Sequence, residues 1–127
     1  MIAAQPGGSK AALERTRQYF RFFLAPGMSH LTGGTGPDSF GSPYGQPALR
    51  DDRVHDVFRA LEAWVEQGIA PDRIVATKYV NDTPAIGAAR TRPLCPYPKL
   101  ARYSGTGNPD DAASFDCVDG PRGAYLD

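Results

Sequence analysis

Glycine and proline divide this chain into short regular elements, and this constrains its fold more than any other feature. The 127 residues include 14 Gly and 12 Pro, which together make up about a fifth of the chain against an average near 12%. Both residue types interrupt helices and strands, so the sequence predicts a loop-rich domain. They are concentrated between residues 25 and 50, where we expect no regular element.

The regular elements that remain alternate between helix and strand. Ser9 can cap a short helix that ends near Arg17. The largely aromatic run from Tyr19 to Leu24 predicts a buried strand that stops at a Pro-Gly pair. Four β-branched residues and a tyrosine predict a second strand over Ile74–Val80.

An amphipathic helix between these two strands is the clearest element. Its apolar residues recur at spacings of three and four, and Gly68 is the expected left-handed cap at its end. Asp51 and Asp52 stand where an N-cap and a first-turn acid would stand. The recurring apolar residues are Val54, Val57, Phe58, Leu61, Trp64 and Val65. Among them Phe58, Leu61 and Trp64 form a stripe that indicates packing in a core rather than a platform for a ligand.

From Asn81 onward the sequence predicts a tail of turns, with one weak helix at Asp110–Phe115. Cys95 and Cys117 lie in this tail and could be two thiols, two metal ligands or one disulfide. A zinc site is the poorest of these choices, because it needs three or four ligands and the only histidines are far away in sequence. A disulfide would stabilise such a tail by about 3 kcal/mol and would imply an oxidising compartment.

Charge and hydropathy exclude two classes of partner. The 14 basic and 14 acidic residues are interspersed and sum to zero, so we predict neither nucleic acid nor a membrane as a partner. No stretch has the length of a membrane span, and residues 1–6 lack the regions of a signal peptide. A chain of this length is expected to form one domain.

His30 is the candidate catalytic residue, because it lies in the loop that follows the predicted strand 19–24. Rigid elements often present catalytic groups on such loops, and histidine titrates near physiological pH. The order strand, histidine loop, helix is typical of the C-terminal end of an α/β-hydrolase, whose triad runs Ser, then Asp or Glu, then His. We find no G-x-S-x-G elbow, and no serine lies on a strand-to-helix turn. The serines are Ser9, Ser29, Ser39, Ser42, Ser104 and Ser114.

Several blocks of the sequence resemble the tannase and feruloyl esterase family. The match covers roughly residues 7 to 118, and the blocks have the order and spacing of that family. They are Phe20–His30 with Gly33–Phe40, Ala63–Lys78, Arg90–Pro98, and Ala101–Gly105 with Asp110–Val118.

The resemblance implies an α/β fold, in which residues 1–127 form a single partial domain from the C-terminal part of an α/β-hydrolase catalytic domain. His30 matches the catalytic histidine, which takes a proton from the nucleophilic serine and returns it to the leaving alcohol. Cys95 and Cys117 match a cysteine pair that is disulfide-linked in the family.

The implied reaction is hydrolysis of a carboxylic ester, commonly of a phenolic acid, through an acyl-enzyme. The expected partner is therefore a small-molecule ester, and family members are typically exported. The family has a calcium site in its lid domain, but no segment here resembles that lid. We therefore expect no cofactor in this chain.

The chain departs from the family in two respects. Leu31 stands where the family commonly has a cysteine that ties the histidine to the serine, so that tether is absent. The serine and acid segments of the triad have no counterpart, because Asp38, Asp51 and Asp52 follow His30 and match no triad position. We therefore predict a C-terminal fragment that is inactive alone. The alternatives are a fragment that acts with a separately encoded N-terminal half and a remnant without activity.

Three further expectations concern residues outside this candidate site. His55 is expected to be exposed in the first turn of the long helix, and Lys78 to face water at a strand edge. If the chain is part of a larger sheet, the apolar face of the helix over residues 54–65 should be exposed.

Overall fold

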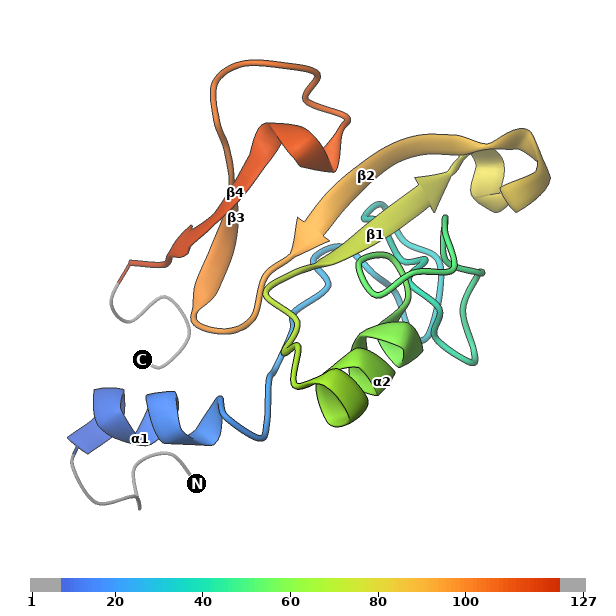
Figure 1. The fold of residues 1–127 in the computed structure, drawn as a ribbon. Coiled ribbons are helices and arrows are strands. Elements are labelled where there is room, and N and C mark those ends of the chain that lie inside the picture. Colours follow the sequence, from blue (N-terminus) through green and yellow to red (C-terminus); the bar gives the residue numbers. More distant parts are fainter. Residues whose placement is uncertain (1–7, 122–127) are drawn as a thin grey trace.

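The computed structural model describes residues 8–121, which form two hairpins, two helices and long connecting loops (Figure 1). The longer helix has 11 residues, and no helix within residues 8–121 is long and apolar enough to cross a membrane. In chain order the elements are α1 (Gly8–Thr16), α2 (Val57–Gln67), β1 (Ile74–Tyr79), the 3-10 turns η2 (Val80–Asp82) and η3 (Pro84–Ile86), β2 (Ala88–Leu94), β3 (Lys99–Tyr103), η4 (Ala112–Ser114) and β4 (Phe115–Asp119).

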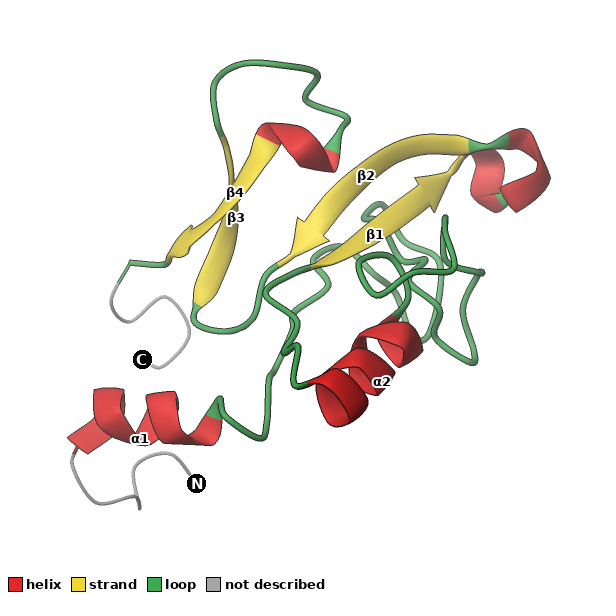
Figure 2. Cartoon of the chain, in the orientation of Figure 1, coloured by secondary structure: helices red, strands yellow, loops and turns green. Residues whose placement is uncertain are grey.

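Both hairpins are antiparallel, with β1 paired to β2 and β3 paired to β4 (Figure 2). The predicted strand 74–80 is confirmed as β1. The prediction of a tail of turns is wrong, because that tail forms β2, β3 and β4. β2 contains Pro93 and two arginines and lacks the alternation of a half-buried strand. It forms because β1 offers it an edge over its whole length. The weak helix predicted near Asp110 is reduced to η4.

The predicted strand Tyr19–Leu24 is wrong as a strand. Phe23 makes a single bridge to Pro96, and the amide of Tyr97 donates to the carbonyl of Phe22 at 2.7 Å. A strand needs a continuous ladder with a neighbour, and residues 96–97 supply one pair only. The segment therefore runs as an extended connection.

The two helices begin and end for identifiable reasons. α1 confirms the expected short helix, but it already includes Gly8, so Ser9 lies inside the helix and is not its N-cap. α2 ends as predicted at Gly68, which has a left-handed φ of 71°, but it begins later than predicted. Its N-cap is Asp56, whose carboxylate accepts from two amides of the first turn. Asp52 caps the preceding turn instead, accepting from the amides of Val54 and His55 at 2.9 Å each.

The core is small and lies between α2 and the β1–β2 hairpin. Its buried members are Ala60, Ile74, Ala76 and Leu94, with Phe23, Ala25 and Phe40 packed against them. The stripe of Phe58, Leu61 and Trp64 on α2 was expected to lie in the core. This is wrong for Phe58 and Leu61, which are 51% and 53% exposed. The expected exposure of the apolar helix face is therefore observed in part, for Phe58, Leu61 and Val65, whereas Val54, Val57 and Trp64 are half-buried.

Candidate active site

His30 lies in the histidine loop, which we define as residues 25–39. The loop connects the extended segment 19–24 to the turns before α2 and packs beside the β1–β2 hairpin (Figure 1). The imidazole of His30 is exposed. Within residues 8–121 it has no hydrogen-bond or ion-pair partner. An exposed, unpartnered imidazole is free to bind a nucleophile supplied from elsewhere.

The backbone turns sharply directly after His30. Leu31 has a φ of 68°, and the amide of Thr32 donates to the carbonyl of His30 at 2.9 Å. A hydrogen bond across three residues with a positive φ at the centre describes a γ-turn, which is rare and strained. Leucine has no special tolerance for this φ, so the surrounding contacts must maintain the turn.

Close backbone packing shapes the rest of the loop. The amide of Gly36 donates to the carbonyl of Gly27 at 2.9 Å, and the amide of Ser29 donates to the carbonyl of Gly33 at 2.9 Å. A Cβ atom at Gly36 would overlap the carbonyl oxygen of Pro26. Glycine is therefore required at residue 36 by the approach of two backbone segments.

Asp38 is a buried carboxylate at the end of the histidine loop, with 1% of its surface exposed. Its Oδ2 accepts from the amide of Gly33 at 2.5 Å and from the hydroxyl of Thr32 at 3.1 Å. Its Oδ1 accepts from the hydroxyl of Ser39 at 3.3 Å. All three donors are neutral groups of the same loop, and the imidazole of His30 is not among them.

Two basic side chains from the β1–β2 hairpin bind carbonyl groups of the loop. The ammonium group of Lys78 donates to the carbonyl of Gly34 at 2.9 Å and pairs with Asp82. The guanidinium group of Arg90, which lies opposite Lys78 in the sheet register, donates to the carbonyl of Thr35. The expectation that Lys78 faces water is therefore wrong, since its side chain is only 14% exposed. The role of Arg90 was not foreseen, because it depends on the unpredicted strand β2.

His55 lies outside the histidine loop, and its expected exposure is wrong. Its side chain is 13% exposed, and its Nδ1 lies 2.8 Å from Oδ1 of Asp52. Partial burial alone would raise the pKa of Asp52, but hydrogen bonds from the His55 ring and from the amides of Val54 and His55 outweigh it and lower that pKa. This pair holds the turn before α2.

None of the other candidate acids and nucleophiles in the described part of the chain contacts the imidazole of His30 through a hydrogen bond or an ion pair. Asp51 pairs with Arg59 at 2.6 Å, and Asp52 pairs with His55. Ser39 and Ser114 are buried. The side chain of Ser9 lies outside the described part of the chain. Within the described part, the structure therefore joins no serine or carboxylate to His30.

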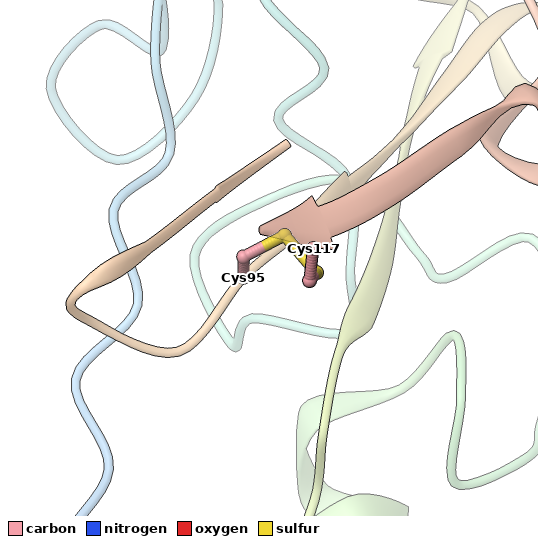
Figure 3. Close-up of a disulfide and its surroundings, with 2 residues drawn as sticks. All are labelled: Cys95 and Cys117. Carbon is pink, nitrogen blue, oxygen red and sulfur yellow. A yellow bond between two sulfur atoms is a disulfide. The ribbon is translucent and has the colours of Figure 1, made fainter. Parts of the chain in front are cut away.

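Cys95 and Cys117 form a disulfide, as the family resemblance implied (Figure 3). Cys95 directly follows β2, and Cys117 lies in the middle of β4, with the two Cα atoms 5.6 Å apart. The bond therefore joins the end of the first hairpin to the second one.

Known proteins of one family are similar to this chain in sequence. The family described as Tannase and feruloyl esterase matches residues 4–118. An uncharacterized esterase from Xanthomonas campestris is 63% identical over 91% of this chain and 20% of its own length. The mono(2-hydroxyethyl) terephthalate hydrolase of Piscinibacter sakaiensis is 42% identical over 87% of this chain and 16% of its own length.

A solved structure shows the same arrangement. Feruloyl esterase B from Aspergillus oryzae superposes on 87% of this chain and 23% of its own, with a TM-score of 0.67 at 28% identity. The chain thus spans a fifth or less of the two curated relatives reported above. The chain belongs to the tannase and feruloyl esterase family.

Proposed function

We propose that this chain supplies the histidine of a serine carboxylic ester hydrolase. The observation that carries the proposal is the exposed, unpartnered imidazole of His30 in a loop held by buried contacts. In this role the imidazole takes the proton of a serine hydroxyl as the serine attacks the ester carbonyl. It then returns a proton to the leaving alcohol, and a second cycle with water releases the acid.

Under this proposal the serine and the orienting acid come from polypeptide other than residues 1–127. The supporting observations are that the match covers only 20% of the length of the Xanthomonas relative and that Asp38, Asp51 and Asp52 are engaged with other groups. Residues 1–127 alone are then inactive, since an imidazole without its nucleophile has nothing to activate.

The substrate class that we propose is an ester of an aromatic carboxylic acid. The names of two relatives support it, because one is a hydrolase of a terephthalate monoester and another a feruloyl esterase. We further propose that the protein works outside the reducing cytosol, which the disulfide between Cys95 and Cys117 supports.

The test uses a fusion enzyme, in which this chain replaces the matching segment of the Xanthomonas relative. The expected result is hydrolysis of ethyl ferulate in preference to ethyl butyrate, with a loss of at least about 10,000-fold in kcat for His30→Ala. The unaltered relative serves as the positive control. The matched variant is His55→Ala, which removes the other histidine and should leave kcat within about threefold. Retained activity in the His30→Ala variant would remove His30 from the mechanism.

A second candidate is a separate polypeptide that acts by association with a partner half. The exposed Phe58, Leu61 and Val65 on α2 favour it, because an apolar helix face of this kind needs a cover. Mixing separately produced halves should then restore hydrolysis, whereas activity only in the covalent fusion enzyme would reject association.

A further inference from the structure

Asp38 is the one buried carboxylate of the histidine loop, and the proposed proton transfers do not use it. Burying a charged or polar group is unfavourable unless its hydrogen bonds are replaced. Here three donors replace them, from Thr32, Gly33 and Ser39. The arrangement therefore concentrates several contacts of the loop on one side chain.

The contacts of Asp38 are made directly after the strained turn of the histidine loop. Thr32 and Gly33 are the two residues that directly follow the strained turn at Leu31. The turn begins at His30, whose carbonyl accepts from the amide of Thr32. Holding residues 32 and 33 thus fixes the far side of the turn and, through it, the direction of the preceding histidine.

Asp38 can hold the loop because its own backbone is attached to a strand. The amides of Asp38 and Ser39 both donate to the carbonyl of Thr77 in β1, at 3.2 and 3.0 Å. In return, the amide of Thr77 donates to the carbonyl of Ser39 at 2.9 Å. The carboxylate therefore transfers the rigidity of β1 to the loop that carries His30.

We infer that Asp38 is a positioning residue, which fixes the turn after His30 and so aims the imidazole at the serine. This inference rests on the proposed function of His30. What the position requires is an acceptor oxygen facing Thr32 and Gly33. The amide oxygen of asparagine can accept both bonds, and its NH₂ group can donate to the oxygen of Ser39.

The test compares Asp38→Ala with Asp38→Asn in the fusion enzyme. A misplaced catalytic group costs up to about 100-fold in rate, so Asp38→Ala should lower kcat by about 10- to 100-fold. KM should stay within about threefold, because substrate binding is not what is lost. Asp38→Asn should recover most of the lost kcat. The matched control is Asp116→Ala, which removes an exposed aspartate of β4 and should leave kcat unchanged.

Hydrogen exchange supplies a readout that does not depend on catalysis. Peptides covering residues 28–37 should exchange faster in Asp38→Ala than in the parent, because the Gly33 amide loses its acceptor. If His30→Ala kept full activity, the proposed function would fail, while this exchange difference would still report whether Asp38 holds the loop. The two failures are therefore distinguishable.

Three results would overturn the inference. They are an unchanged kcat in Asp38→Ala, a loss confined to KM, and equal losses of kcat in Asp38→Ala and Asp38→Asn. If Asp38→Ala does not fold, Thr32→Val decides, since it removes one donor and keeps the buried carboxylate satisfied by Gly33 and Ser39. The expected result for Thr32→Val is a several-fold loss of kcat, and an unchanged kcat would reject the inference.

Discussion

The histidine loop and the C-terminal hairpin, formed by β3 and β4, are both irregular in sequence, but they are held in different ways. The loop takes its shape from single contacts, such as those of Asp38 and Lys78 with its backbone. The hairpin has a ladder of paired residues, and a disulfide ties its strand β4 to the residue that follows β2. A ladder repeats the same backbone hydrogen bonds, so the remaining pairs keep the hairpin in place when one pair is lost. The loop has no such redundancy, and each of its contacts determines a particular turn.

This difference predicts that substitutions in the two regions change different properties. In the hairpin they should change the free energy of unfolding and leave a distant catalytic group in place. In the histidine loop they should change the geometry around His30, including cases where the protein remains folded. The predictions below test this separation in the fusion enzyme.

Gly36→Ala should have the largest effect. An added Cβ would overlap the carbonyl oxygen of Pro26, and relief requires two backbone segments to move apart, at a cost of about 3 kcal/mol. Both the free energy of unfolding, measured with urea, and kcat should decrease. The matched control is Gly33→Ala, where a Cβ meets no neighbour and only the positive φ costs about 1 to 2 kcal/mol. Equal effects of the two substitutions would show that close packing does not shape the loop.

Replacing Cys95 and Cys117 by serine tests the other region. The disulfide closes a separation of 22 residues, and its loss should lower the free energy of unfolding by about 3 kcal/mol. The kcat of the folded variant should equal that of the parent, because neither cysteine lies in the histidine loop. Thiol alkylation before and after reduction verifies the bond in the parent. A large fall in kcat without unfolding would break the proposed separation.

Lys78→Met should lower the free energy of unfolding less than the loss of the disulfide does, but it should increase hydrogen exchange in the histidine loop. It removes the donor to the carbonyl of Gly34 and the ion pair with Asp82, for a loss of about 1 to 2 kcal/mol. Hydrogen exchange should increase in residues 33–36. Lys99→Met, at a lysine of β3, is the control and should leave exchange in the loop unchanged. An unaltered loop in Lys78→Met would assign its support to Arg90 and Asp38 alone.

The elements that the sequence predicted are those set by local signals. The cap at Gly68 and the β-branched run of β1 depend on residues within the element itself, and both are observed. β2 was missed because its Pro93 and arginines carry no strand signal, and only the partner strand β1 makes it regular. The segment 19–24 shows the converse, since it has a strand composition and only one bridging neighbour.

The same distinction applies to the candidate site. His30 was proposed as the candidate catalytic residue from its sequence context, whereas the groups that hold its loop were not predicted. Leu31 carries no signal for a positive φ, so the turn that brings Thr32 and Gly33 to Asp38 was not predictable. Lys78 was placed at a water-facing edge, because nothing in a strand pattern indicates that a distant loop will cover one face of the strand.

Acid should loosen the loops more than the C-terminal hairpin, and Asp52 provides the smallest and most specific test. Its pKa is lowered, against the effect of partial burial, by the His55 ring and by the amides of Val54 and His55. Since the folded-state pKa lies below the unfolded value, the carboxylate contributes stability above about pH 4 and loses it as the pH falls further. Asp52→Ala should therefore cost about 1 kcal/mol at neutral pH.

That cost should shrink when urea unfolding is measured at pH 3, because the parent then also loses the charged cap. Asp116→Ala provides the comparison in the hairpin and should change stability little at either pH. A cost for Asp52→Ala that stays constant from pH 7 to pH 3 would contradict a role for the charge. The carboxyl group of Asp52 would then hold the turn before α2 equally well with or without its charge. Acid would no longer affect the loops and the C-terminal hairpin differently, although the ladder of backbone hydrogen bonds in the hairpin contains no group that titrates.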